Sequence, residues 1–235
     1  MNFKKWLHFS VLKSFDVSES QLHESKDELD DIKYGRTKDE RYLRNAPTPF
    51  FGDSWKKWSM EPPPANSSPT TAKELKQLAN NQKSITKKQR EAIERQDVLN
   101  PEIEFVKLLE SLGQKLSKEE KQEITKIQKQ LTTIGLHYKE HFDRPRPIQL
   151  MKKIHPAEKP LRANSGTAAY PSGHALIGTF LGLYLSEKYP NYRKQLKKLG
   201  EELGYNRVLG GFHYPSDVAA GNKLGQMLYR NIIKR

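Results

Sequence analysis

Cysteine is absent from this chain of 235 residues. Its absence excludes disulfide bonds, thiolate ligands to a metal and catalysis by a cysteine nucleophile. The absence of cysteine does not indicate the redox compartment, because such a chain is compatible with an oxidising or a reducing one.

Long apolar runs are also missing, since no stretch approaches the roughly 20 residues that cross a bilayer. The longest, residues 175–185, contains glycines and ends at Ser186-Glu187-Lys188, so it predicts a buried helix. We expect no cleavable signal peptide, and by default a cytoplasmic location, because polar residues interrupt the N-terminal apolar positions. Those residues are His8, Ser10 and Lys13.

Positive charge is abundant, with 41 Lys and Arg against 28 Asp and Glu and a net charge of +13. Such a balance favours anionic partners: phosphate esters, nucleic acid or an acidic membrane surface. Only 35% of the residues are hydrophobic, which indicates that part of the chain is highly solvated.

The N-terminal part predicts an extension, residues 1–60, that is partly ordered. Apolar residues recur every fourth position at Phe3, Leu7, Val11 and Phe15, which favours a short helix packed on the domain or, alternatively, docked on a membrane surface. Residues 17–45 are mostly polar, whereas four aromatic residues speak against complete disorder of the next part: Phe50, Phe51, Trp55 and Trp58.

The main domain, residues 61–235, begins at the proline run 62–64 and contains only helical patterns, so we predict an all-α helical bundle in a single domain. Residues 70–98 indicate a helical and very polar stretch. A second helix begins at Pro101, has an apolar face of Ile103, Val106, Leu108 and Leu109, and ends at Gly113.

A long helix follows, with a capping box of Ser117 and Glu120 and apolar residues at spacings of three and four up to Tyr138. Another begins at Pro190, and Gly210-Gly211 ends it. Four glycines in the last helices predict close approach of neighbouring backbones: Gly178, Gly182, Gly221 and Gly225.

Three polar clusters stand out. Ser172-Gly173-His174 opens a helix, where free N–H groups and the helix dipole attract anions. The second cluster consists of Lys139, at the end of the long helix, and Arg146, on the following turn with two prolines. The third cluster consists of Arg207, His213 and Asp217. Three cations suit one phosphoryl group, and two histidines suit a nucleophile and a general acid. Asp217 can orient the ring of His213.

The spacing Lys139-x6-Arg146-Pro147, Pro171-Ser172-Gly173-His174 and Arg207-x5-His213-x3-Asp217 resembles the signature of the phosphatidic acid phosphatase type 2 superfamily. From about Pro62 to Ile232 the chain is most similar to bacterial class A non-specific acid phosphatases. The superfamily also contains membrane lipid phosphatases and vanadium-dependent haloperoxidases.

The resemblance implies a metal-independent acid phosphatase without a cofactor. It implies that His213 attacks phosphorus and forms a phosphohistidine, that Asp217 holds the other ring nitrogen, and that His174 protonates the leaving alcohol. Phosphoryl oxygens would be bound by Lys139, Arg146, Ser172, Gly173 and Arg207. The expected ligands are a phosphorylated small molecule and, as an inhibitor, vanadate; relatives suggest a homo-oligomer.

Two features depart from that pattern. Asn206 stands where the family usually has serine, and class A enzymes are commonly secreted with cysteine pairs, which puts a periplasmic location in doubt. Arg144 also precedes a proline, but the spacing from Lys139 selects Arg146; we expect Arg144 to be solvated or a cation behind the site. His137 and His141 fit surface or rim positions.

Three alternatives stay open. A vanadate-dependent haloperoxidase would share the anion site, and a lipid phosphate phosphatase would use the N-terminal stretch. A basic nucleic-acid-binding protein without catalysis belongs to a different class, and nucleic acid is the less favoured partner.

Overall fold

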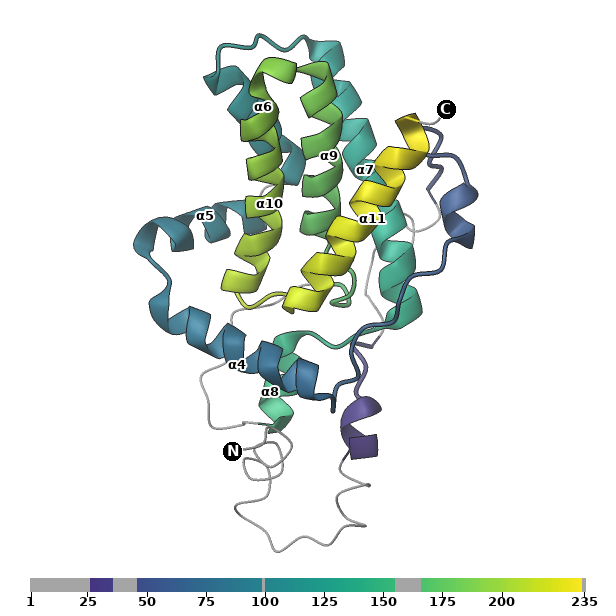
Figure 1. The fold of residues 1–235 in the computed structure, drawn as a ribbon, viewed down its shortest axis with the longest axis vertical. Helices are drawn as coiled ribbons and strands as arrows, with labels where there is room; N and C mark the ends of the chain where they lie inside the picture. Colours follow the sequence, from purple (N-terminus) through teal and green to yellow (C-terminus); the bar gives the residue numbers. More distant parts are fainter. Residues whose placement is uncertain (1–25, 36–45, 99, 155–165, 234–235) are drawn as a thin grey trace, which may run out of the picture.

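The computed structural model describes residues 26–35, 46–98, 100–154 and 166–233. The predicted helix around Phe3 to Phe15 lies outside these residues, as does most of the polar stretch 17–45. In the described part of the chain every regular element is a helix, so the predicted all-α class is confirmed (Figure 1). No helix there combines the length and the apolar character that a bilayer crossing requires.

After a short helical segment at 26–30, the elements follow in chain order. They are η1 (Ser54–Lys57), α4 (Pro69–Ser84), α5 (Lys87–Val98), α6 (Pro101–Ser111), α7 (Lys118–Phe142), α8 (Pro147–Ile154), α9 (Gly173–Lys188), η2 (Pro190–Tyr192), α10 (Arg193–Leu209) and α11 (Pro215–Ile233).

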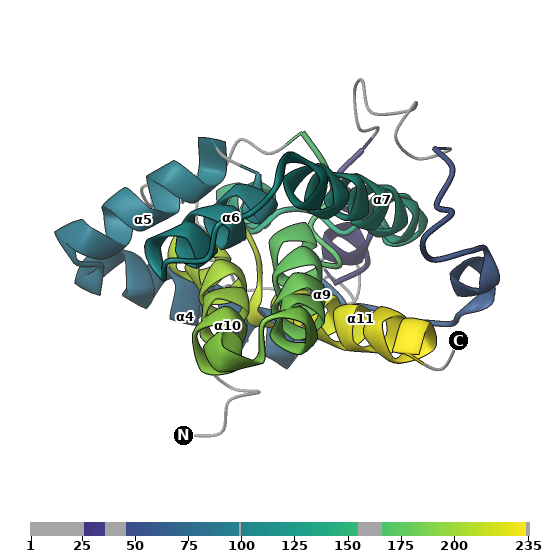
Figure 2. The same cartoon turned by 90° about the horizontal axis from the view of Figure 1, so that it is seen from above.

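Helix α9 is the centre of the bundle. It is apolar on all sides, and a helix of that kind has to be buried. It packs against α10, α11, α7 and α6, and Figure 2 shows it between α10 and α11, with α7 above it in that view. A Cβ on Gly178 of α9 would lie 2.7 Å from the Gly200 carbonyl oxygen of α10, and one on Gly225 would lie 2.8 Å from that of Leu176. The predicted close approaches are therefore confirmed.

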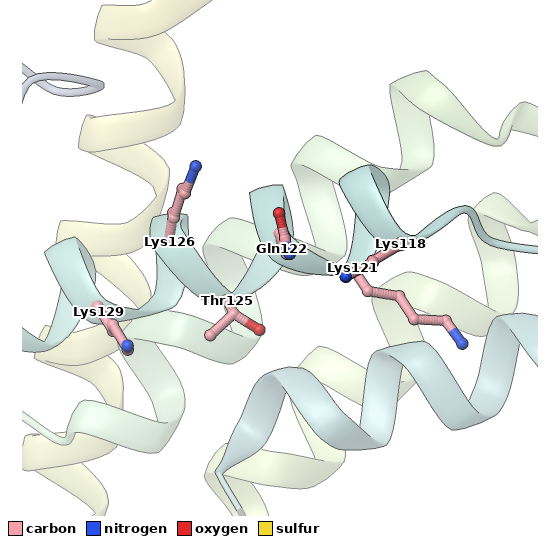
Figure 3. A pocket seen from close by; sticks show the side chains of 6 residues that line it. All are labelled: Lys118, Lys121, Gln122, Thr125, Lys126 and Lys129. Carbon is pink, nitrogen blue, oxygen red and sulfur yellow. The ribbon is translucent and has the colours of Figure 1, made fainter.

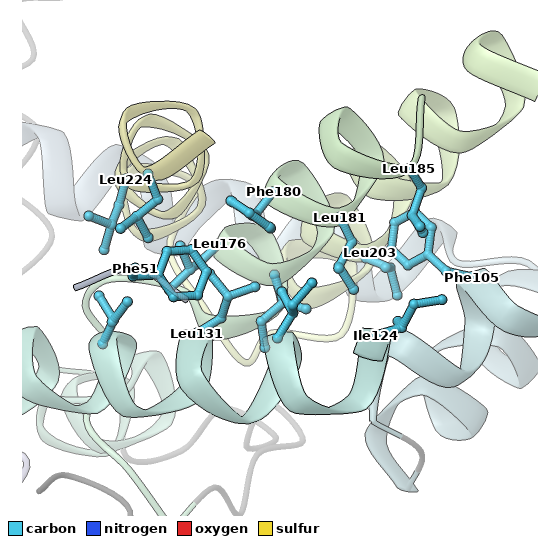
Figure 4. Close-up of a cluster of buried hydrophobic side chains, with 14 of the residues drawn as sticks. Phe51, Phe105, Ile124, Leu131, Leu176, Phe180, Leu181, Leu185, Leu203 and Leu224 are labelled. Carbon is cyan, nitrogen blue, oxygen red and sulfur yellow. The ribbon is translucent and has the colours of Figure 1, made fainter. Parts of the chain in front are cut away.

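The main hydrophobic core lies between α9 and its neighbours (Figure 4). Phe51 and Trp55 are fully buried in it beside residues of α6 and α7, which explains the aromatic residues of the N-terminal part. Residues 46–58 thus contribute to the helical core. The division between residues 60 and 61 stays a prediction.

The predicted helical character of residues 70–98 is confirmed. This stretch forms two helices, because Thr86 and Gln89 make a capping box that starts α5, with Gln89 N donating to Thr86 Oγ1 over 3.2 Å. One local prediction needs correction. The predicted apolar face of α6 was wrong in part. Phe105, Leu109 and the carboxylate residues Glu102 and Glu104 are buried, whereas the other three predicted residues are only half-buried.

The long helix α7 was predicted correctly. Ser117 and Glu120 form the capping box, and the apolar residues of the repeat, up to Tyr138, are all buried. Asp143 ends the helix in a left-handed conformation with φ of 45°, so the chain turns away directly after the last turn, which carries Lys139. That turn leads to Arg146 at the start of α8.

Candidate active site

The candidate residues gather where α7, α10 and the two connections leading into α9 and α11 meet, near the lower ends of these helices in Figure 1. Lys139 comes from the last turn of α7 and Arg207 from the last turn of α10. Ser172 is the N-cap of α9, and Asp217 lies in the first turn of α11. Segments more than seventy residues apart thus meet at one place.

His213 is held from both sides of its ring. Its Nδ1 lies 3.2 Å from Oδ2 of Asp217, and its Nε2 lies 2.9 Å from Nη1 of Arg146. A carboxylate accepts and a guanidinium donates, so the pair of contacts places the ring proton on Nδ1 and the lone pair on Nε2. The lone pair of Nε2 therefore points towards the guanidinium of Arg146.

Asp217 is also held in place by hydrogen bonds. Its Oδ2 also accepts from the backbone N–H of Tyr214 over 2.9 Å, and its carbonyl accepts from the N–H of Ser172 over 2.9 Å. The second bond joins the start of α11 to the start of α9. The predicted placement of Asp217 beside His213 agrees with this geometry.

Backbone carbonyls position two of the cations. Arg146 donates to the carbonyls of Thr167 and Phe212, each over 2.8 Å, and to Oγ1 of Thr167 over 3.1 Å. Lys139 donates to the carbonyl of Ala168 over 2.5 Å. Both cations are almost completely buried, and burial lowers the pKa of Arg146 to about 10, although Asp217 opposes that shift.

Arg207 brings unpaired donors into the site. Its Nη2 donates to Oδ1 of Asp97 over 2.8 Å, and its guanidinium lies 3.7 Å from the ring centre of Phe212. Its Nε and Nη1 are buried and, within the described residues, have no hydrogen-bond acceptor. A buried guanidinium with two unsatisfied donors is suited to an oxyanion.

His174 faces the end of α5. Its Nε2 lies 3.0 Å from the carbonyl oxygen of Gln96, and since a carbonyl only accepts, Nε2 carries the proton and Nδ1 the lone pair. Burial, and next the charge of Arg207, lower the pKa of His174 to about 3. The imidazolium is therefore disfavoured unless a negative charge enters beside it.

The same charges act on His213, whose pKa lies well below the usual value because of burial first and then because of Arg146, Lys139, Arg207 and His174. His213 thus stays neutral at mildly acidic pH.

The remaining predicted residues lie at the start of α9. Ser172 is fully buried, and its Oγ accepts from the N–H of Ala175 over 3.4 Å. Gly173, the first residue of the helix, has nothing within 4 Å of a Cβ position. The helix start is therefore open beside the two histidines.

Arg144 is the main correction among the candidates. The expectation that it is solvated was wrong: the side chain is 1% exposed and its Nη1 donates to Oδ1 of Asp217 over 2.6 Å. The alternative, a cation behind the site, agrees with the structure. His137 and His141 are exposed on α7, as expected for surface residues.

Sequence reasoning missed the partners of the site. Glu74 of α4 and Gln96 and Asp97 of α5 lie 70 or more residues from the side chains they contact. They belong to polar helices in which nothing distinguishes them from their solvated neighbours. Thr167, in the loop before α9, was also missed.

A shallow hollow on α7 lies apart from these residues (Figure 3). Lysines dominate its lining, and one of them, Lys121, is paired with Glu110 of α6. None of the candidate site residues lines it. The lining residues are Lys118, Lys121, Gln122, Thr125, Lys126 and Lys129.

Part of the chain is similar to known proteins. Residues 127–232 match the model of the PAP2 superfamily. A non-specific acid phosphatase of Salmonella typhimurium is 34% identical over 128 residues, which cover 52% of this chain and 50% of that protein. A non-specific acid phosphatase of Providencia stuartii is 46% identical over 56 residues, covering 24% and 23%.

A crystal structure of a bacterial vanadium-dependent iodoperoxidase shares the fold, with a TM-score of 0.57 at 16% identity over 77% of this chain and 53% of that one. The chain spans about half the length of the Salmonella relative. All eight predicted site residues fall within the matched range. Residues 127–232 are thus similar to the PAP2 superfamily.

Proposed function

We propose that this protein is a metal-independent acid phosphatase that hydrolyses phosphomonoesters through a phosphohistidine on His213. The observation that carries the proposal is the hydrogen-bonded row Asp217–His213–Arg146, which leaves the lone pair on Nε2 and places it beside a cation. Arg207 adds two buried donors without an acceptor among the described residues. The named relatives, which are acid phosphatases, support the same reaction class.

In the first step, Nε2 of His213 attacks phosphorus while the bond from phosphorus to the ester oxygen breaks. The leaving oxygen takes a proton from the imidazolium of His174, and an N–P bond has replaced the O–P bond. Arg146 exchanges its hydrogen bond to Nε2 for one to a phosphoryl oxygen, and Lys139 and Arg207 bind the other oxygens. Ser172 and the N–H of Gly173 complete the binding site.

In the second step, His174 takes a proton from water and the new hydroxyl oxygen attacks phosphorus. The N–P bond breaks, the electron pair returns to Nε2 of His213, and inorganic phosphate leaves. Asp217 stabilises the charge on the ring while phosphorus is bound, because it accepts from Nδ1 throughout.

Activity best at mildly acidic pH follows from the two lowered pKa values. His213 stays neutral and nucleophilic as the pH falls. His174 has to be protonated, which becomes more favourable at lower pH and when the phosphoryl dianion offsets the charge of Arg207. We therefore expect kcat/KM for an aryl phosphate to rise from pH 8 towards pH 6.

The test is hydrolysis of an aryl phosphate by the parent, by His213→Ala and by His141→Ala, whose ring is exposed on α7. We expect loss of activity by several orders of magnitude in the first variant and parental activity in the second. An acid-labile phosphoenzyme should form in the parent and in His141→Ala but not in His213→Ala. Parental turnover in His213→Ala would reject the proposal.

Further arms of the same experiment separate the alternatives. Vanadate should inhibit competitively and a chelator should have no effect. Halide oxidation by peroxide after vanadate loading would favour a haloperoxidase, and preference for a lipid phosphate over water-soluble esters would favour a lipid phosphatase. Tight, salt-dependent binding of DNA without hydrolysis would favour the nucleic-acid-binding class.

A further inference from the structure

A buried cluster of ions lies directly behind Asp217. The guanidinium of Arg144 contacts Oδ1 of Asp217 over 2.6 Å on one side and Oε2 of Glu74 over 3.4 Å on the other. The three side chains are 1%, 0% and 9% exposed. One cation is thus shared by two carboxylates in a region from which water is excluded.

The cluster is held by more than its charges. Arg144 also donates to Oγ of Ser216 over 2.8 Å and lies 3.9 Å from the ring centre of Tyr214. Glu74 accepts from the N–H of Ser216 over 2.6 Å and from its Oγ over 2.9 Å. These contacts fix α4 against the first turn of α11, the turn that carries Asp217.

Asp217 uses its two oxygens for different partners. Oδ2 accepts from His213 Nδ1 and from the N–H of Tyr214, while Oδ1 accepts from Arg144. The bond to Arg144 fixes the second oxygen and therefore, together with the bond from the N–H of Tyr214, sets how the carboxylate is rotated relative to the ring of His213. A carboxylate free to rotate would hold the Nδ1 proton less well, and the ring could then change its tautomer.

We propose that Arg144 is a positioning residue that holds Asp217 so that His213 presents the lone pair of Nε2, and that Glu74 balances the charge of Arg144. This inference rests on the proposed function for its effect on rate. Its effect on the ring of His213 is independent of any activity.

Arg144 and Glu74 shift the protonation equilibrium of His213 in opposite directions. Removing the charge of Arg144 leaves the negative charge of Asp217 uncompensated and therefore favours the imidazolium form of His213. Removing the charge of Glu74 leaves the positive charge of Arg144 less compensated and therefore disfavours the imidazolium form of His213. The other ionisable groups facing the cluster are Tyr170 and Tyr214. Around His213 they are Arg146, Lys139, Arg207 and His174, which neither change alters.

The experiment compares the parent with Arg144→Gln, Arg144→Lys and Glu74→Gln. The control is Arg95→Gln, which removes an arginine paired with Glu104 elsewhere. Two quantities are measured: the tautomer of His213 by ring-nitrogen NMR, identified by the signal lost in His213→Asn, and the acid limb of kcat/KM against pH for an aryl phosphate.

We expect one tautomer, with the proton on Nδ1, in the parent, in Glu74→Gln and in the control. Arg144→Gln should show a mixture and lose about 10- to 100-fold in kcat, the range found for residues that orient a ligating or reacting group. Its inhibition by phosphate should change little, because Arg144 does not contact the phosphoryl site. Arg144→Lys should restore part of the rate.

The acid limb should move to higher pH in Arg144→Gln, by about one pH unit, and to lower pH in Glu74→Gln. Shifts in the same direction, no shift in either variant, or a single Nδ1 tautomer in Arg144→Gln would overturn the proposal. If Arg144→Gln fails to fold, Arg144→Lys and Glu74→Gln still decide it. A parent without phosphatase activity would refute the proposed function, while the NMR comparison would still judge the role of Arg144.

Discussion

Asn206 donates a hydrogen bond from Nδ2 to Oε1 of Gln96 over 2.9 Å, and the backbone carbonyl of the same glutamine lies 3.0 Å from Nε2 of His174. One residue of α5 therefore joins the end of α10 to the candidate general acid. Serine, which the family usually has at position 206, is too short to make this contact. The departure from the family pattern is thus matched by a partner on another helix.

Asn206→Ser should consequently lower stability. Gln96 is buried, and its side-chain oxygen would lose its donor, which costs about 1 to 3 kcal/mol. We expect a fall of that size in the free energy of unfolding measured with urea, with kcat reduced only a few-fold. Asn231→Ser, where the amide makes only a 3.4 Å contact with Ser54, is the control. An unchanged midpoint in Asn206→Ser would contradict the role of this pair.

Asp217→Asn should reduce kcat by about 10³- to 10⁴-fold, as for the corresponding change in a serine-protease triad. The amide can present its NH2 group to Nδ1 of His213, which then loses its proton to Nε2 and with it the nucleophilic lone pair. The measurement is single-turnover hydrolysis of an aryl phosphate. Asp53→Asn, at an exposed residue paired with Lys56, is the control and should retain parental rates.

Much of the fold could be predicted because the apolar period of α7 is strong and because α9 is a continuous apolar run. The capping box of Ser117 marked the start of α7, and glycines marked the close contacts of α9 with α10 and α11. The apolar face of α6 could not be placed, because Glu102 and Glu104 are buried there and Glu104 is compensated by Arg95. Tertiary pairing of that kind leaves no local pattern.

In the candidate site, too, some residues follow a local sequence pattern whereas others depend on contacts with distant helices. The residues of the family signature follow a fixed spacing, so Lys139, Arg146 and Arg207 could be named from the sequence as candidates for binding phosphate. Arg144 could not be assigned, because its position depends on Glu74 of α4, 70 residues earlier. Whether an arginine is solvated or buried is decided by the carboxylates that surround it, and these come from distant helices.

The contact between α9 and α10 predicts a large effect of one methyl group. In Gly178→Ala, the Cβ would lie 2.7 Å from the Gly200 carbonyl oxygen, so the two backbones have to separate. Such overpacking costs about 1 to 3 kcal/mol in the free energy of unfolding. Gly166→Ala, where nothing lies within 4 Å, should unfold at the parental midpoint. Equal midpoints for the two variants would refute the close packing.

Acidification should destabilise the protein through His174. Its pKa is about 3 in the folded state and about 6.5 in the unfolded chain, because burial and then Arg207 disfavour the imidazolium. Below pH 6.5 the unfolded chain therefore binds a proton that the folded protein does not. This group removes up to about 1.4 kcal/mol of stability per pH unit as the pH falls towards 3, and has no effect above pH 7.

The measurement is urea unfolding of the parent and of His174→Gln at several pH values between 7.5 and 4.5. Glutamine cannot take up a proton, so the free energy of unfolding of this variant should fall less steeply on acidification, and the two curves should converge towards low pH or cross. His141→Gln, at an exposed residue of α7, should follow the slope of the parent. Parallel curves for the parent and His174→Gln would mean that the folded protein protonates His174 as readily as the unfolded chain. The cations around the site would then not exert the repulsion on which the proposed order of protonation depends.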